Sequence, residues 1–241
     1  RYSSSSGVYK PIWMENVSSF HLTDFSFTED IEHHGVKVLV KANDKGTAKV
    51  LILNKEYEVE IGKETFLYLK EDLHLWSDKD PYLYSVKLTY RDDIVYSYFG
   101  LRKREIKEKD GYRRLYLNGH PVFLSGLLDQ GYYGTSRLTP SSYQDYLDDI
   151  LKTKEMGFNC LRVHRKTEIP YFYYLADRYG ILLIQDFPCG GYRPKFIPTV
   201  LPRLFPSYSK EKHIHREKLG RKDDASLAGF EKERKEWLPF S

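Results

Sequence analysis

Short alternating runs of hydrophobic and polar residues fill the chain from about residue 17 to residue 107. Alternation with a period of two is typical of half-buried β-strands, and turn residues separate the runs. The pattern predicts strands at Phe20–Phe27, Val36–Val40, Ala48–Leu53, Tyr57–Ile61, Thr65–Leu69, Tyr82–Leu88 and Ile94–Gly100. This number and spacing of short strands predicts an antiparallel β-sandwich of immunoglobulin-like type.

The pattern of hydrophobic and polar residues changes near Arg102. Asn118-Gly119 lies between two apolar runs and predicts a β-hairpin. The second arm continues as the nearly unbroken apolar run Phe123–Leu128, which predicts a strand buried on both faces.

Helical and strand-like spacing then alternate. A helix is predicted from Thr139-Pro140 to Gly157, a strand at Asn159–Val163, a helix from Ile169 to Gly180 and a strand at Ile181–Gln185. This β-α-β-α-β order with short connections predicts the beginning of a parallel α/β domain.

The two ends of the chain are less regular. The apolar positions between Val8 and Met14 predict one more strand, which would need a partner strand. After a proline-rich stretch, a charged amphipathic helix is predicted from Ala225 to Trp237, with Leu227, Phe230 and Trp237 facing inward.

Composition narrows the function classes. The 241 residues are 41% hydrophobic, enough for one large or two smaller domains. The net charge of +4 comes from interspersed acids and bases, which argues against a nucleic-acid partner. No apolar run is long enough to predict a membrane span.

The sequence also has few residues that could bind a cofactor or a metal. Cys160 and Cys189 do not predict a disulfide framework and favour a reducing, cytoplasmic compartment, while Arg1 is not a natural initiator and leaves localisation open. His213 and His215 lack a third metal ligand, and Cys189-Gly190-Gly191 does not continue as a phosphate-binding loop. We expect no cofactor and no metal.

Polar residues follow three successive strands of the predicted parallel sheet, where active sites of such domains lie. They are Asp129 and Gln130, Arg162 and His164, and Gln185 and Asp186. Arginine can grip a carboxylate and the others can bind hydroxyl groups, so the set suits a polyhydroxylated or anionic ligand, with Tyr132 and Tyr133 as an apolar wall. The alternative is an Arg162–Asp186 ion pair that joins neighbouring strands and contacts no ligand.

Four parts of the chain carry a family resemblance: Ser6–Glu15, Leu75–Tyr84, Phe99–Arg102, and Leu117–Gly126 together with Gly157–Arg162. In this order they resemble glycoside hydrolase family 2, the β-galactosidases, β-glucuronidases and β-mannosidases. The resemblance implies that residues 1–17 are the last strand of a jelly-roll sugar-binding domain and residues 18–105 an immunoglobulin-like sandwich. Residues 106–241 would be the incomplete N-terminal part of a (β/α)8 TIM barrel.

The family implies a retaining hydrolysis of O-glycosidic bonds by two glutamates. The acid/base normally follows an asparagine, and no Asn-Glu pair occurs here. The resemblance therefore implies a fragment, truncated at its C-terminus and also its N-terminus, of a β-galactosidase-like enzyme, with no catalytic residue on this chain and no activity alone. Arg162 would orient the nucleophilic carboxylate, His164, Asp129 and Gln130 would line the sugar subsite, and Asp186 would support it.

Two other hypotheses remain open. The chain could be a non-catalytic carbohydrate-binding or scaffolding β-sandwich module with an α/β appendage. It could also be an unrelated α/β enzyme that uses Asp129 and Asp186 as an acid/base pair. For a partial barrel we also expect self-association, because apolar strand faces would be exposed.

Overall fold

The computed structural model describes residue 8 and residues 10–134, 136 and 138–186. Four sequence features lie outside these residues: the start of the first predicted strand, Cys189, the His213–His215 pair and the predicted helix Ala225–Trp237.

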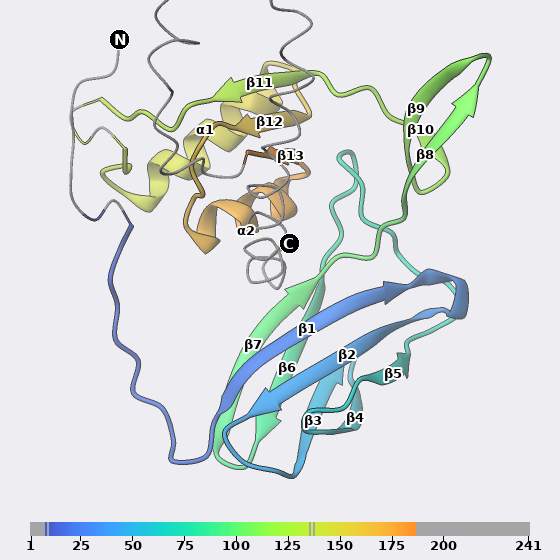
Figure 1. Ribbon diagram of the computed structural model, residues 1–241, viewed down its shortest axis with the longest axis vertical. Coiled ribbons are helices and arrows are strands. Elements are labelled where there is room, and N and C mark those ends of the chain that lie inside the picture. Colours follow the sequence, from blue (N-terminus) through green and yellow to red (C-terminus); the bar gives the residue numbers. More distant parts are fainter. Residues whose placement is uncertain (1–7, 9, 135, 137, 187–241) are drawn as a thin grey trace, which may run out of the picture. The chain divides into compact units, whose positions relative to one another are not determined.

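The alternating region forms two antiparallel sheets, consistent with a sandwich (Figure 1). One sheet has the order β1-β2-β5 and the other the order β4-β3-β6-β7. The strands are β1 (Leu22–Asp30), β2 (Gly35–Ala42), β3 (Thr47–Ile52), β4 (Lys55–Glu60), β5 (Thr65–Tyr68), β6 (Tyr84–Tyr90) and β7 (Asp93–Phe99). Each overlaps a strand that the sequence predicts, so those predictions are confirmed.

The inner faces of these sheets share one core. Val36, Val38 and Val40 of β2 are fully buried, while Lys37 between them is not. From the other sheet, Val50 and Leu88 are also fully buried. Side chains of successive strand residues point to opposite faces of the sheet. Hydrophobic residues at every second position therefore form one buried face, and the polar residues between them form one solvent-exposed face.

The hairpin predicted at Asn118-Gly119 is confirmed. Strand β9 (Tyr112–Leu117) turns into β10 (His120–Pro121) through Asn118 at φ 52° and Gly119 at φ 81°. Two residues of positive φ are those of a type I′ turn, which glycine and asparagine tolerate best. Strand β8 (Arg104–Lys109) pairs with the other edge of β9.

The doubly buried strand predicted after this hairpin is wrong. Residues 122–125 are not in a strand, Phe123 is 84% exposed, and β11 begins only at Gly126 and ends at Asp129. Within the described residues only one face of β11 is covered, because the helices lie on that side alone. Apolar content therefore predicted the strand but not its surroundings.

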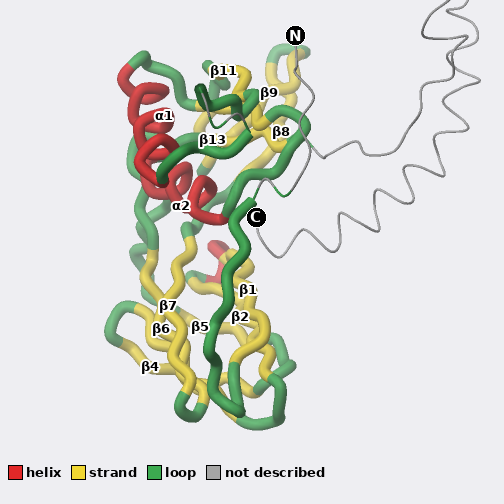
Figure 2. The backbone as a smooth tube through the Cα atoms, turned by 90° about the vertical axis from the view of Figure 1, so that its left-hand side faces the viewer, coloured by secondary structure: helices red, strands yellow, loops and turns green. Residues whose placement is uncertain are grey.

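The predicted β-α-β-α-β unit is confirmed. Strands β11, β12 (Cys160–Val163) and β13 (Leu182–Gln185) are parallel neighbours in that order. Helices α1 (Tyr143–Glu155) and α2 (Pro170–Tyr179) lie between them in the chain. Figure 2 shows both helices on one side of this sheet. Ile150 of α1, Val163 of β12 and Phe172 of α2 are fully buried in the shared core.

Helix α1 starts later than the predicted Thr139-Pro140. Its first residue is Tyr143, and the Asp145 carboxylate accepts a 2.9 Å hydrogen bond from the N–H of Ser142. This hydrogen bond satisfies a backbone donor at the helix start. The ends are as predicted, since Gly157 and Gly180 both adopt positive φ beyond the last turns.

The predicted strand between Val8 and Met14 is wrong in its described part. Residues 10–17 pair with no strand among the described residues, and Ile12 and Met14 are 83% and 98% exposed. Strands are stabilised by neighbours, so apolar alternation without a neighbouring strand does not suffice.

Trp76 connects the sandwich core to α2. Its indole Nε1 donates a 2.7 Å hydrogen bond to the carbonyl of Asp177, and its side chain is buried. The Asp177 carboxylate accepts hydrogen bonds from Arg102 and from the Tyr98 hydroxyl.

The domain boundaries predicted at residues 17 and 105 stay predictions. No helix in the described part of the chain is long and apolar enough to span a membrane.

Candidate functional site

Among the described residues, no helix covers one face of the parallel sheet, and Arg162 lies on that face. Arg162 is in register with Leu128 of β11 and Ile184 of β13. Leu128 and Ile184 are 53% and 44% exposed. Their chain neighbours Leu127 and Leu183 pack against the helices instead. We call the surface formed by Leu128, Arg162 and Ile184 the open face.

Arg162 and Asp186 form a bidentate ion pair on the open face. Arg162 Nε and Nη2 donate to the two carboxylate oxygens of Asp186, each at 3.0 Å. These hydrogen bonds, and the positive charges of Arg162 and His164, hold the pKa of Asp186 below its usual range. The N–H of Asp186 continues the sheet ladder by donating to the carbonyl of Val163 at 3.0 Å. The strand spacing therefore brings Arg162, His164 and Asp186 together, and the Arg162–Asp186 ion pair that the alternative to a ligand site predicts is present.

Asp129 does not join this group. It is in register with Val163, whose side chain is buried among the helices, so strand alternation turns Asp129 to the helix side. Its carboxylate accepts a 2.7 Å hydrogen bond from the N–H of Gly131. Its backbone carbonyl accepts one from the N–H of His164 at 2.8 Å. Gln130 directly follows the last residue of β11 and is half-buried, so strand alternation does not assign it to either face.

Two charged residues that the sequence did not single out are buried behind the open face. Lys166 and Glu168 lie in the loop from β12 to α2, and their side chains are 10% and 2% exposed. Lys166 Nζ is 2.6 Å from Glu168 Oε1. In the sequence, charges beside a proline at a helix start resemble an ordinary solvated loop. Only the tertiary structure could reveal this pair.

The loop that contains Lys166 also organises the end of β13. Gln185 Nε2 donates to the carbonyl of Lys166 at 2.7 Å, and Gln185 Oε1 accepts a 2.6 Å bond from the Tyr173 hydroxyl. Gln185 was predicted to offer its side chain at a strand end. In the structure its hydrogen bonds go to the protein instead.

The predicted aromatic wall is split in the same way. Tyr133 packs edge-on against Tyr146 of α1, with 5.7 Å between ring centroids, and Lys166 Nζ lies over its ring. Burial, and then the charge of Glu168, raise the pKa of the Tyr133 hydroxyl. Tyr132 is 51% exposed.

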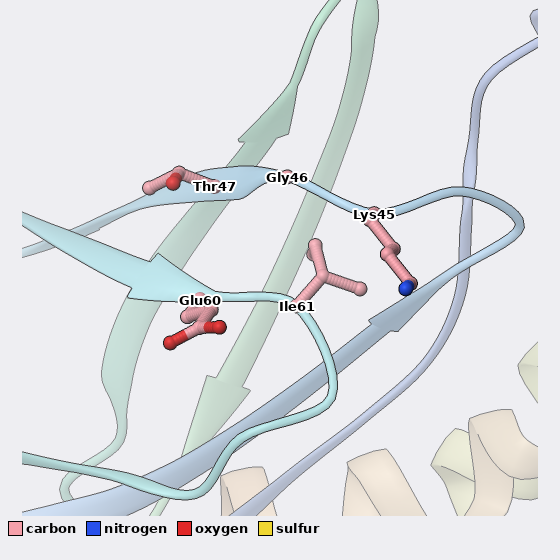
Figure 3. Close-up of a pocket in the computed structure, with 5 residues that line it drawn as sticks. All are labelled: Lys45, Gly46, Thr47, Glu60 and Ile61. Atoms are coloured by element: carbon pink, nitrogen blue, oxygen red, sulfur yellow. The ribbon is translucent and has the colours of Figure 1, made fainter.

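The pockets lie elsewhere. Figure 3 shows one of about 450 Å³ at an end of the sandwich, lined by Lys45, Gly46, Thr47, Glu60 and Ile61. A second, of about 660 Å³, lies between Val8–Pro11 and the start of α1. Neither contains any of the predicted site residues. Among the described residues, no group of three His, Cys, Asp or Glu side chains could hold a metal ion.

Known proteins resemble this chain over most of its length. It is 28% identical over 210 residues to a β-galactosidase of Thermoanaerobacter pseudethanolicus, covering 78% of this chain and 28% of the relative. It is 26% identical over 199 residues to a β-glucuronidase of Streptococcus agalactiae, covering 77% and 32%. The chain is a homologue of the β-galactosidases and β-glucuronidases of glycoside hydrolase family 2. No protein-family model matches it.

Solved structures of β-glucuronidases share the fold of this chain. A Faecalibacterium prausnitzii β-glucuronidase superimposes with a TM-score of 0.62 at 23% identity, covering 70% of this chain and 28% of that one. A Ruminococcus gnavus β-glucuronidase in complex with D-glucuronic acid gives 0.61 at 22% identity, covering 70% and 30%. The chain thus spans about 28–32% of the length of these four proteins.

Proposed function

We propose that this chain carries one wall of a carbohydrate site of a retaining β-glycosidase, with β-galactosidase-like specificity. Arg162, His164 and Asp186 form the core of that wall, and Gln130 lies beside it. Asp129 contributes through its backbone carbonyl, which accepts a hydrogen bond from the N–H of His164. The observation that carries the proposal is the Arg162–Asp186 pair on the open face of the sheet. The relatives named β-galactosidase and β-glucuronidase support it.

The pair is suited to orient a further group. Asp186 occupies Nε and one hydrogen of Nη2. Nη1 of Arg162 has no hydrogen-bond partner among the described residues, so it can donate to a carboxylate or a sugar hydroxyl. A guanidinium held by one carboxylate keeps a fixed direction for its remaining donors. The Arg162 side chain is 53% exposed, so a ligand can reach them.

The finer architecture belongs to the same proposal. In it, β1–β7 are an immunoglobulin-like sandwich and β11–β13 are the first strands of a (β/α)8 barrel. Sequential parallel neighbours with a helix between successive strands have the connectivity of that barrel, whose active sites lie at the carboxyl ends of the strands. The sequence contains no Asn-Glu pair, so we expect this polypeptide to bind sugar without hydrolysing it.

The test uses the purified 241-residue chain. Aryl β-galactoside and aryl β-glucuronide should show no turnover above background. D-galactose or D-glucuronate should bind with a dissociation constant on the order of 1 mM. Amide chemical shifts should change at Arg162, His164 and Asp186, and Arg162→Ala should abolish those changes.

Arg91→Ala is the matched control. Arg91 is also ion-paired, with Asp44 at 2.7 Å, but lies on the sandwich. The control should bind sugar like the wild type. Turnover by the pure chain would refute the expected inactivity. Binding that survives Arg162→Ala and shifts only sandwich amides would favour a carbohydrate-binding module instead.

A further inference from the structure

The buried Lys166–Glu168 pair needs an explanation that stability does not supply. Removing two charges from water is expensive, and a packed apolar pair is often at least as stable. The two side chains are nevertheless almost fully buried beside the apolar core of the helices. What distinguishes a charged pair is the number and direction of its hydrogen bonds.

Lys166 uses its bonds to hold the loop that follows β11. Its Nζ donates to the carbonyl of Gly131 at 3.0 Å and to the carbonyl of Leu138 at 2.9 Å. These two carbonyls lie near the beginning and the end of the segment Gln130–Leu138. The backbone carbonyl of Lys166 is in turn bound by Gln185 of β13. A single residue thus connects the carboxyl ends of all three parallel strands.

Glu168 fixes the direction of the ammonium group. Its Oε1 faces Lys166, and its Oε2 accepts a 2.9 Å hydrogen bond from the Tyr146 hydroxyl of α1. Burial, and then the negative charge of Glu168, raise the pKa of Tyr146, which therefore remains a donor. Among the described residues, only Oε2 accepts a hydrogen bond, while Oε1 contacts Lys166 Nζ as an ion pair without hydrogen-bond geometry. The hydrogen bonds of Lys166 are therefore directed to the two carbonyls.

The backbone on both sides of this contact has unusual conformations. Arg165 has a φ of 58°, in the left-handed region that residues with a Cβ rarely adopt. Its N–H interacts with the Asp186 carboxylate, while the next side chain, Lys166, enters the interior. Gly131 has a φ of 61°, and a Cβ there would lie 2.0 Å from Lys166 Cε. The two loops are therefore shaped to each other.

We propose that Lys166 is a positioning residue: by binding the carbonyls of Gly131 and Leu138, it fixes the backbone next to Gln130 so that Gln130 and Arg162 contact the same sugar. This inference rests on the proposed function. It assigns to the buried pair a role in ligand affinity, because a loop that is already fixed loses less conformational entropy on binding.

The experiment compares four variants of the 241-residue chain, with D-galactose and D-glucuronate as probes. Lys166→Met removes these two hydrogen bonds. The double variant Lys166→Met with Glu168→Gln also removes the unpaired charge and keeps an acceptor for Tyr146. Gly131→Ala displaces Lys166 while leaving both charges in place. Gly134→Ala is the control in the same loop, since a Cβ there meets nothing within 4 Å.

We expect the double variant to melt near the wild-type temperature but to bind sugar about tenfold more weakly or worse, the scale of one lost hydrogen bond. Amides of residues 130–138 should exchange hydrogen faster in it, and Gly131→Ala should behave in the same way. Gly134→Ala should bind like the wild type. Gly131→Ala provides the result if the double variant does not fold.

Two results would overturn the positioning role. One is wild-type affinity in the double variant or in Gly131→Ala, with or without faster exchange in the loop. The other is an affinity loss that occurs only in variants whose melting temperature is below that of the wild type, which would show that the pair acts through stability alone. A wild-type chain that binds neither sugar would instead refute the proposed function, and the positioning role with it.

Discussion

The sandwich and the parallel sheet bury their apolar residues to very different extents. In the sandwich, two sheets cover each other, and inward residues such as Val38 and Leu88 are fully buried. In the parallel sheet, helices cover one face, and Leu128 and Ile184 remain largely exposed on the other. The sandwich meets its own packing needs, whereas the open face has no such cover among the described residues.

The candidate site lies in the region with the poorer cover. Arg162 is on the same face as Leu128 and Ile184, so its surroundings depend on whatever adjoins that face. The buried Lys166–Glu168 pair lies behind that face, on the covered side. The sandwich, whose apolar core is fully packed, is thus not the region that contains the candidate site residues.

The strongest test compares one leucine from each region. Leu88→Ala should lower the free energy of unfolding by about 2–5 kcal/mol, because it opens a cavity in the sandwich core. Leu128→Ala should change it by less than about 0.5 kcal/mol in dilute solution, because that side chain already contacts water. Urea denaturation of both variants measures the difference.

Equal costs for the two variants would contradict the comparison, since Leu128 would then be buried in solution. A cost for Leu128→Ala that grows with protein concentration would point to association through the open face, because association adds to stability by mass action.

Self-association through the open face is the second prediction. We expect the chain to sediment as a dimer or larger species, because exposed apolar strand faces promote association. Leu128→Asp should shift it towards monomer, since a buried unpaired carboxylate is costly. Tyr112→Asp, at a residue 67% exposed beside the Asp110-Gly111 turn between β8 and β9, is the control and should sediment like the wild type. A monodisperse wild-type monomer would rule the idea out.

The smallest expected effect concerns pH. The folded chain lowers the pKa of Asp186 through the hydrogen bonds from Arg162, so this carboxyl stabilises the fold above its unfolded pKa of about 4. That contribution disappears as pH falls through the lower folded value. In acid-range denaturation series, Asp186→Asn should therefore lose less stability than the wild type below about pH 4.

Asp92→Asn, in the exposed turn between β6 and β7, is the control for that measurement. Other carboxyls with lowered pKa, such as Asp30 and Asp44, contribute equally to both variants and cancel. An acid profile of Asp186→Asn that matches the wild type would show that the ion pair adds nothing to stability.

Much of the fold was predictable because local pattern determines it. Alternation located each sandwich strand, Asn118-Gly119 located the hairpin, and Gly157 and Gly180 located the helix ends. The failures share one cause. The strand between Val8 and Met14 and the doubly buried run after Pro121 were inferred from apolar content, which says that a segment can be buried but not that a neighbour is present.

The candidate site was predictable in the same measure. Residues spaced by two along parallel strands share a face, so Arg162, His164 and Asp186 could be grouped from the sequence. The same rule separates Asp129 from them, but only once the register with Val163 is known. Whether their roles are those of sugar-binding residues stays a prediction.

By itself, the sequence determined which segments become strands and helices, and which polar residues follow the strands, because these depend on spacing along the chain. Only the tertiary structure decided which face each strand buries, that Arg162 pairs with Asp186, and that Lys166 and Glu168 are enclosed. The physical reason is that burial and hydrogen bonding at these residues depend on partners some 2 to 35 positions away along the chain, whose approach no local pattern specifies.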